Sequence, residues 1–173
     1  MKRIQSLMNE PLYTEYVERN SRSEKERLCP HNMSHHFDVA RITYILILEN
    51  NDLDYFIKES KLSSRMAAKE VIYAAGLLHD IGKWAEYREG IDHSSYSAKL
   101  ARGLLPRALF NYEEIEIISR AIDEHENQND EMSFLGEKLY RAENLSRICS
   151  QCQHNTQCGK INSKEANADL IEY

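Results

Sequence analysis

The chain has 173 residues, of which 42% are hydrophobic and 29% charged, a composition typical of one soluble globular domain with a substantial core. No apolar run approaches the roughly 20 residues that span a bilayer. The first residues lack the apolar core of a signal peptide, so we expect a cytoplasmic protein without a membrane partner. The formal charge of −6 and the scattered basic residues disfavour binding to long nucleic acids, but they allow a local cationic pocket for a phosphate.

The N-terminal third predicts two helices around a segment rich in metal-binding side chains. A helix is expected over Pro11 to Arg19, with the proline near its first position. The next segment gathers one cysteine and three histidines within eight residues: Cys29, His31, His35 and His36. From Phe37 a wide apolar stripe predicts a second helix that ends near Asn50.

The stretch around His79 is the most informative in the chain. A dense apolar run from Val71 to Leu78 predicts a buried helix, capped at its start by Ser63 or Ser64. This helix ends on the adjacent His79 and Asp80, two side chains that are costly to bury unpaired, and Lys83 follows. The pattern indicates a metal site with a phosphate nearby. The alternative is a histidine at the helix dipole, a capping aspartate and a solvated lysine.

The second half of the chain predicts three more helices. We expect a mixed segment from Trp84 to Gly90 over the site, and then helices over about 94–105, 112–125 and 133–148. The sequence therefore predicts an all-α fold with no strand. One helical-bundle domain is expected over residues 1–150, with a cysteine-containing C-terminal segment, 149–173, packed on it.

Metal-capable side chains fall repeatedly near the ends or the middle of these helices, where bundles build metal sites. The candidates are His35, His79, Asp80, His93, His125 and Glu143. Each has an ordinary structural alternative. The histidines can lie at helix termini for reasons of surface exposure or of the helix dipole, and Glu143 can form an exposed ion pair with Arg147. Their joint order favours a shared metal site.

These residues resemble the signature of the HD-domain metal-dependent phosphohydrolases, over about residues 27–150. The matching stretches are His35-His36-Phe37-Asp38-Val39-Ala40-Arg41, Gly76-Leu77-Leu78-His79-Asp80-Ile81-Gly82-Lys83 and Arg141-Ala142-Glu143-Asn144-Leu145-Ser146. His93 and His125 match two further histidines of members that bind two metals, such as the bacterial diadenosine tetraphosphate hydrolases. One departure is Glu143, which stands where most members have aspartate.

The resemblance implies one metal held by His35, His79, Asp80 and Glu143, and a second held by His93 and His125 with Asp80 bridging. Imidazole and carboxylate ligands suit iron, manganese, nickel or zinc. The expected function is a metal-dependent phosphohydrolase that acts on a phosphate ester or a nucleotide through metal-activated water, with Asp80 and Lys83 as catalytic residues. The alternatives are a non-catalytic metal- or nucleotide-binding module of the same fold, and a redox or docking protein built on the cysteines.

The cysteines form a separate expectation. A subset of the family has one cysteine before the first motif and three after the last, as Cys29, Cys149, Cys152 and Cys158 are placed here. Convergence of four thiolates predicts a structural zinc or an iron–sulfur cluster. The spacing alone does not decide between the two. His31 or His154 can replace one of them. The alternative is four separate reduced thiols.

Overall fold

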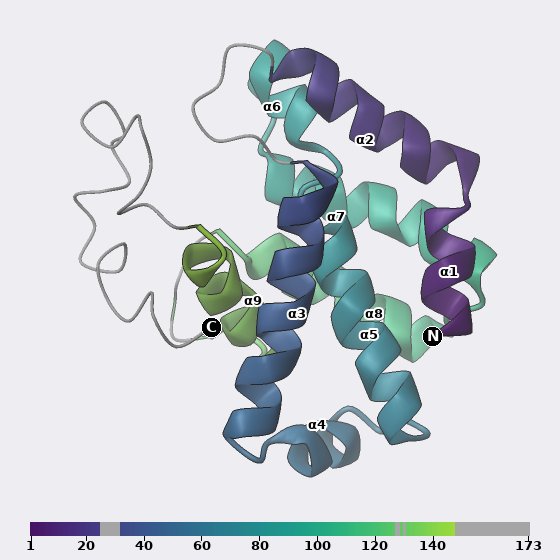
Figure 1. Cartoon of the computed structure of the whole chain (residues 1–173), viewed down its shortest axis with the longest axis vertical. Coiled ribbons are helices and arrows are strands. Elements are labelled where there is room, and N and C mark those ends of the chain that lie inside the picture. Colours follow the sequence, from purple (N-terminus) through teal and green to yellow (C-terminus); the bar gives the residue numbers. More distant parts are fainter. Residues whose placement is uncertain (25–31, 127–128, 130, 148–173) are drawn as a thin grey trace.

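A computed structural model describes residues 1–24, 32–126, 129 and 131–147 of the chain. Within these residues the protein is entirely helical, as the sequence predicts (Figure 1). The elements are α1 (Lys2–Met8), α2 (Pro11–Ser23), α3 (Met33–Glu49), α4 (Leu53–Glu59), α5 (Arg65–Leu78), α6 (Lys83–Glu89), α7 (His93–Leu104), the 3₁₀-helix η1 (Leu105–Ala108), α8 (Tyr112–Glu124) and α9 (Phe134–Leu145).

Helix α5 is the centre of the bundle. It packs against α3, α8 and α4, and α9 packs against both α3 and α8. α3 and α5 are antiparallel neighbours joined through α4, so the start of α3 lies beside the end of α5 (Figure 1). Nearly every side chain of α5 from Ala67 to Leu78 is buried, as the dense apolar run predicts.

A glycine sets the distance between these two helices. A Cβ atom added to Gly76 of α5 would lie 2.5 Å from the Cα of Ala40 in α3, closer than real carbon atoms approach. Since the only atoms available at this contact are backbone and one alanine, α3 and α5 touch backbone to backbone one turn before α5 ends.

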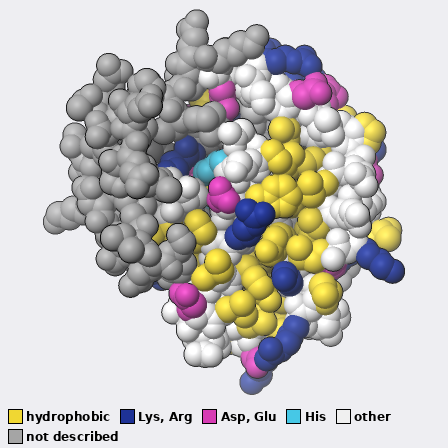
Figure 2. Space-filling model, in the orientation of Figure 1, with side chains coloured by type: hydrophobic (Ala, Val, Ile, Leu, Met, Phe, Trp, Pro, Cys, Tyr) yellow, Lys and Arg dark blue, Asp and Glu magenta, His cyan; other side chains and the backbone are white. Residues whose placement is uncertain are grey.

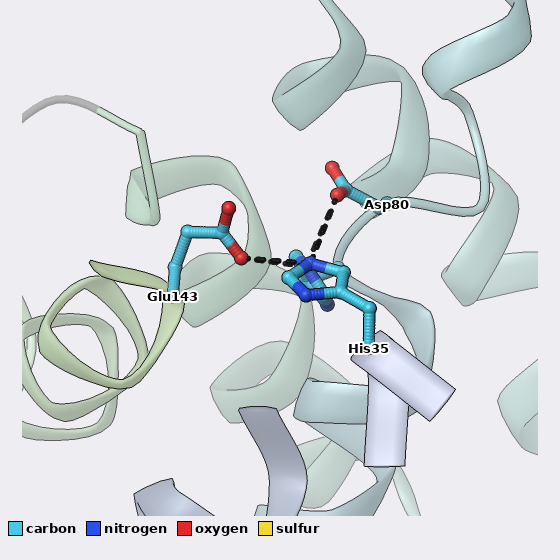
Figure 3. A group of neighbouring side chains, drawn as sticks. His35, Asp80 and Glu143 are labelled. Atoms are coloured by element: carbon cyan, nitrogen blue, oxygen red, sulfur yellow. Dashed lines mark ion pairs between the residues drawn. The ribbon is translucent and has the colours of Figure 1, made fainter. Parts of the chain in front are cut away.

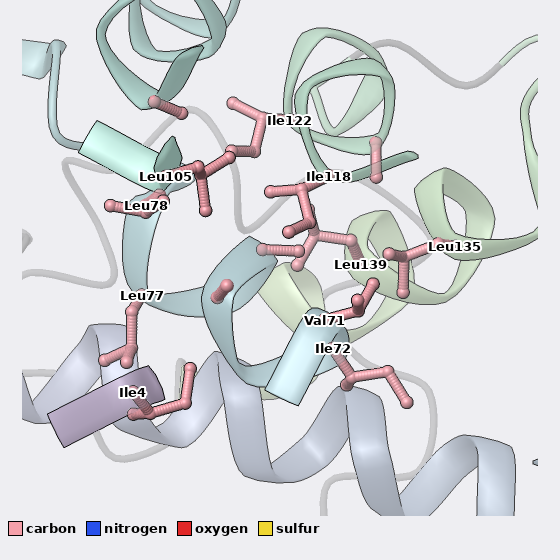
Figure 4. Close-up of a cluster of buried hydrophobic side chains, with 14 of the residues drawn as sticks. Ile4, Val71, Ile72, Leu77, Leu78, Leu105, Ile118, Ile122, Leu135 and Leu139 are labelled. Carbon is pink, nitrogen blue, oxygen red and sulfur yellow. The ribbon is translucent and has the colours of Figure 1, made fainter. Parts of the chain in front are cut away.

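The core is formed by aliphatic side chains from all the main helices, among them Ile4, Val71, Ile72, Leu77, Leu78, Leu105, Ile118, Ile122, Leu135 and Leu139 (Figure 4). Each fully buried Leu or Ile contributes about 1.5–3 kcal/mol relative to exposure. The ends of the helices carry the polar residues that define the site, so the core holds those ends together.

Short polar motifs begin the helices where the sequence predicts them. The Ser64 side chain accepts a hydrogen bond from the Ala67 amide, 3.1 Å away, and caps α5. Asn111 and Glu114 form the predicted capping box of α8. Helix α7 ends at Leu104 and continues as a 3₁₀ turn that contains Pro106.

Two elements differ from the expectation. Residues 84–90, expected to be a mixed segment, form the end of α6 and its C-terminal Gly90, which adopts the left-handed conformation with φ of 67°. Helix α1 was not predicted, because its seven residues show too few apolar positions for a periodic pattern. Arg3 of α1 forms ion pairs with Glu70 of α5 (2.6 Å) and Glu114 of α8 (2.5 Å), so tertiary contacts hold this short helix in place.

Candidate metal centre

Five elements bring six polar side chains to one buried point at the end of α5. His35 lies in the first turn of α3, His79 and Asp80 follow the end of α5, and His93 begins α7. His125 follows α8 and Glu143 lies in α9. All six side chains are less than a tenth exposed. Within the described residues, the structure thus places together all six side chains that the sequence predicts as ligands of this metal site.

The first group joins His35, His79, Asp80 and Glu143. Figure 3 shows His35, Asp80 and Glu143 of this group. His35 Nε2 lies 2.9 Å from Glu143 Oε2 and 3.8 Å from Asp80 Oδ2. His79 Nε2 lies 3.2 Å from Asp80 Oδ2 and 3.4 Å from Glu143 Oε2. The four potential ligand atoms lie within 4.8 Å of one another, so they can hold one metal ion.

The second group joins Asp80, His93 and His125, also within 4.8 Å of one another. Asp80 Oδ1 lies 3.1 Å from His93 Nε2 and 3.6 Å from His125 Nε2. Asp80 therefore directs one carboxylate oxygen to each group. This is the arrangement of a carboxylate that bridges two metals.

Backbone and hydroxyl groups set the tautomers of three of these histidines. His79 Nδ1 lies 2.7 Å from the Gly76 carbonyl, and His125 Nδ1 lies 2.6 Å from the Ile122 carbonyl. Because a carbonyl only accepts, each Nδ1 carries the proton and each Nε2 presents a lone pair to the centre when the ring is neutral. His35 Nδ1 lies 3.3 Å from Ser146 Oγ, which itself donates to the Glu143 carbonyl. Such contacts orient metal-binding histidines.

The donor set fits a metal because carboxylate oxygens face ring nitrogens that accept hydrogen bonds when neutral. His79 Nε2 and Glu143 Oε2 are buried and have no hydrogen-bond partner in the described structure. Burial lowers the pKa of His79, but Asp80 and Glu143 outweigh it and raise the pKa to about 10. Burial acts against ionisation of Asp80, yet His79 and the neighbouring histidines hold its pKa well below its usual range. The centre therefore stabilises added positive charge, which protons or a divalent metal can supply.

Glu143 takes part both in the buried centre and in an ion pair with Arg147. Its Oε1 accepts hydrogen bonds from Arg147 Nε (3.1 Å) and Nη2 (2.9 Å), while its Oε2 faces His35 and His79. Burial acts against ionisation of Glu143, but Arg147 and the histidines hold its pKa well below its usual range. The ion pair with Arg147 therefore fixes the carboxylate with one oxygen toward the centre.

Lys83 is buried beside the second group, on the first turn of α6. Its Nζ lies 3.0 Å from His93 Nδ1, 2.7 Å from Glu86 Oε2 and 3.4 Å from Glu126 Oε1. Burial lowers the pKa of Lys83, but Asp80, Glu86 and Glu126 together raise it, so the ammonium stays charged. Figure 2 shows a histidine side chain at the surface between basic and acidic side chains.

Sequence reasoning missed several neighbours of the site. Glu86 and Glu126 lie next to Lys83 and His93, but isolated glutamates in a charged chain carry no signal. Asn20 and Ser97 hydrogen-bond the backbone of the turn after His79, and they come from distant helices. Cys29, Cys149, Cys152 and Cys158, with His31 and His154, lie outside the described residues, as does the C-terminal segment from 148 to 173.

Comparison with known families confirms the resemblance carried by the motifs. The model of the HD domain matches residues 32–150. The chain therefore belongs to the HD domain family of metal-dependent phosphohydrolases. Among the described residues, no helix is both long and apolar enough to cross a membrane.

Three relatives illustrate the range of the matches. An uncharacterized protein of Clostridium beijerinckii is 35% identical over 159 residues, which cover 91% of this chain and 92% of that protein. A bifunctional uridylyltransferase/uridylyl-removing enzyme of Bradyrhizobium sp. strain BTAi1 is 35% identical over 101 residues, 54% of this chain and 10% of that enzyme. A ribonuclease Y of Lactobacillus gasseri is 29% identical over 113 residues, 62% of this chain and 19% of that enzyme. No solved structure matches the chain.

Proposed function

We propose that this protein is a phosphohydrolase that hydrolyses a phosphate ester or a nucleotide with a pair of divalent transition metals. The observation that carries the proposal is the position of Asp80, whose two carboxylate oxygens face two separate groups of buried histidines. The second group turns two ring nitrogens toward the Asp80 oxygen that the first group does not face, which supports a second metal at this carboxylate.

His35, His79, Asp80 and Glu143 would hold one metal, and Asp80, His93 and His125 the other. Iron, manganese, nickel or zinc suit these ligands. When bound, such metals lower the pKa of a coordinated water and polarise a phosphoryl group. The tautomers of His79 and His125, set by backbone carbonyls, keep their Nε2 lone pairs available for this role.

Two cations flank the centre and suit an anionic substrate. Lys83 lies beside His93, and Arg147 Nη2 lies 3.3 Å from His35 Nε2 at the other end. We assign Lys83 the contact with a phosphate oxygen, as a compact positive charge. Two of the matching regions belong to enzymes named as a ribonuclease and a uridylyl-removing enzyme. Both names concern nucleotide chemistry, which supports a nucleotide as the substrate class.

The test combines metal analysis with an assay. The purified chain is stripped with a chelator and reloaded with iron, manganese, nickel or zinc, and hydrolysis of p-nitrophenyl phosphate, bis(p-nitrophenyl) phosphate and a nucleotide panel is measured. We expect activity that the chelator abolishes and one of these metals restores. Metal binding without any turnover would instead identify a binding module.

The number of metals is tested separately. Anomalous scattering from crystals soaked in manganese or iron should show two peaks roughly 3.5–4 Å apart. His93→Ala should remove one metal per chain and keep the other, because the first group does not use His93. A single peak in the unsubstituted protein would contradict the two-metal assignment.

A further inference from the structure

The segment from Asp80 to Trp84 includes the turn between α5 and α6 and the first residues of α6, among them Lys83, and a residue outside the family match holds it. The Asn20 side chain of α2 is fully buried, and both of its polar atoms are used. Nδ2 donates to the Asp80 carbonyl at 2.7 Å, and Oδ1 accepts from the Trp84 amide at 2.8 Å. One amide group thus bonds both ends of the five-residue segment from Asp80 to Trp84.

These two hydrogen bonds satisfy groups that helix ends leave open. Trp84 is the second residue of α6, whose N-cap position, Gly82, has no side chain to accept from the first amides. Asn20 supplies that acceptor from another helix. An N-cap asparagine usually accepts such a hydrogen bond within its own helix. Its amide nitrogen serves the Asp80 carbonyl just past α5. The Asp80 carbonyl also accepts from the Lys83 amide at 3.0 Å, so Asn20 adds a second bond to that carbonyl and supplies the acceptor for Trp84.

The opposite side of the turn is fixed as well. The Gly82 amide donates to Ser97 Oγ of α7 at 2.9 Å, and a Cβ at Gly82 would lie 2.9 Å from the Ser97 nitrogen. Arg19, next to Asn20 in α2, lies with its guanidinium 4.9 Å from the centre of the Trp84 ring. The turn is therefore clamped between α2 and α7, and Asn20 is the only side chain among the described contacts that bonds it at both ends.

We infer that Asn20 is a positioning residue of the metal centre: it fixes the backbone from Asp80 to Trp84, and so the placement of the Asp80 carboxylate and the Lys83 ammonium. This inference rests on the proposed metal-binding function of Asp80. It extends the site to the N-terminal helices, which lie before the residues that the HD domain model matches.

Asn20→Ala removes both hydrogen bonds and is compared with Thr43→Val. Thr43 is equally buried, but its hydroxyl bonds only the Val39 carbonyl of its own helix, so this control measures the cost of losing a buried polar group away from the turn. Two quantities are measured on folded, full-length protein: the affinity for Mn²⁺, from free Mn²⁺ in electron paramagnetic resonance, and the hydrogen exchange of individual amides. Trp84 is the single tryptophan, so its fluorescence also reports on the turn.

We expect Asn20→Ala to raise the dissociation constant for Mn²⁺ about tenfold, the lower end of the effect of outer partners on metal affinity. Exchange at the Trp84 amide should accelerate at least as much, while amides in the middle of α3 and α5 stay as slow as in Thr43→Val. Asn20→Asp separates the two bonds. It keeps an acceptor for Trp84 but opposes the Asp80 carbonyl with an oxygen, so Mn²⁺ affinity should fall while the Trp84 amide stays protected.

The inference is overturned if Mn²⁺ affinity and Trp84 exchange in Asn20→Ala stay within twofold of the unsubstituted protein, or if exchange accelerates evenly across the chain as in a general loss of stability. Should the alanine variant fail to fold, Asn20→Ser carries the same measurements. If the unsubstituted protein binds no Mn²⁺ or other transition metal, the proposed function fails, and local exchange at Trp84 still decides whether Asn20 holds the turn.

Discussion

Two clusters of buried carboxylates stand out among the described residues, one at Arg3 and one at Asp80, and they are built in different ways. At one, Arg3 places its guanidinium between Glu70 and Glu114 and over the ring of Phe110, 4.3 Å from its centre. Glu70 also accepts from the Arg3 backbone amide at 3.2 Å. Every carboxylate in this cluster has a cation of the chain itself, so the cluster is complete as folded.

The centre at Asp80 has the reverse composition. Two carboxylates, Asp80 and Glu143, meet ring nitrogens that are acceptors when neutral. Arg147 bonds one oxygen of Glu143 from the edge, and the other oxygen faces His35 and His79. An ion pair that serves stability alone gains from the closed arrangement of Arg3, because a buried charge without a partner costs several kcal/mol. The comparison supports the proposal that the cluster at Asp80 binds an external cation, and the following variants test that difference.

The largest effect on activity is expected from Asp80→Ala. It removes the carboxylate common to both groups, and since changes in outer partners alone cost 10–100-fold, the loss of metal affinity and of kcat/KM should exceed about a hundredfold. Metal content by mass spectrometry and the hydrolase assay measure it. Asp38→Ala, an exposed aspartate of α3, is the matched control. Full metal content and activity in the Asp80 variant would show that the cluster is structural.

The next largest effect on activity is expected at Glu143, where two variants separate the role of its charge from that of its side-chain length. Glu143→Gln removes the negative charge between Arg147 and the histidines and should reduce kcat/KM about 10–100-fold. Glu143→Asp keeps the charge and should retain activity within about tenfold. Equal activity in both variants would mean that Glu143 serves only Arg147, as Glu70 serves Arg3.

A smaller effect is expected from Lys83→Met. The substitution removes one charge-assisted contact to a phosphate, worth about 1.5–3 kcal/mol, so KM should rise at least about tenfold while metal content stays unchanged. Lys69→Met, on an outer face where the ammonium lies over Tyr44 and Tyr73, is the control. A loss of metal in Lys83→Met would instead place Lys83 with the residues that support His93.

The smallest effect on activity is expected from Arg3→Met. Removing the cation leaves Glu70 and Glu114 without their partner, and the free energy of unfolding should fall by about 3 kcal/mol. Metal content and kcat per folded chain should not change, because Arg3 contacts none of the six residues of the centre. Denaturant unfolding and the assay below the transition check both quantities. A specific loss of metal would remove the distinction between the two clusters.

Much of this architecture is predictable because its signals are local. The buried helix before His79, its Ser64 cap and the capping box at Asn111 follow from apolar density and from side chains three residues apart. The six residues of the centre were found because imidazoles and carboxylates recur near helix ends and match a family motif.

The contacts that hold the centre are different, because they join residues far apart in the sequence. Asn20 bonds a turn sixty residues later, and Arg3 bonds a glutamate 111 residues later, without any periodic pattern that would mark either. Helix α1 went unpredicted for the same reason, since its stability comes from those distant partners. Local sequence therefore indicates which side chains do chemistry, and only the folded chain shows what aligns them.

The close approach at Gly76 has a consequence for the spacing of the ligands. The contact with Ala40 lies three residues before His79 and five residues after His35, roughly 4.5 and 7.5 Å along the two helix axes. The contact between α3 and α5 at Gly76 therefore lies close to both histidines. An added methyl group there would spread the helices and swing the two imidazoles apart. The separation of His35 and His79 thus depends in part on a residue without a side chain, whose carbonyl also orients the His79 ring.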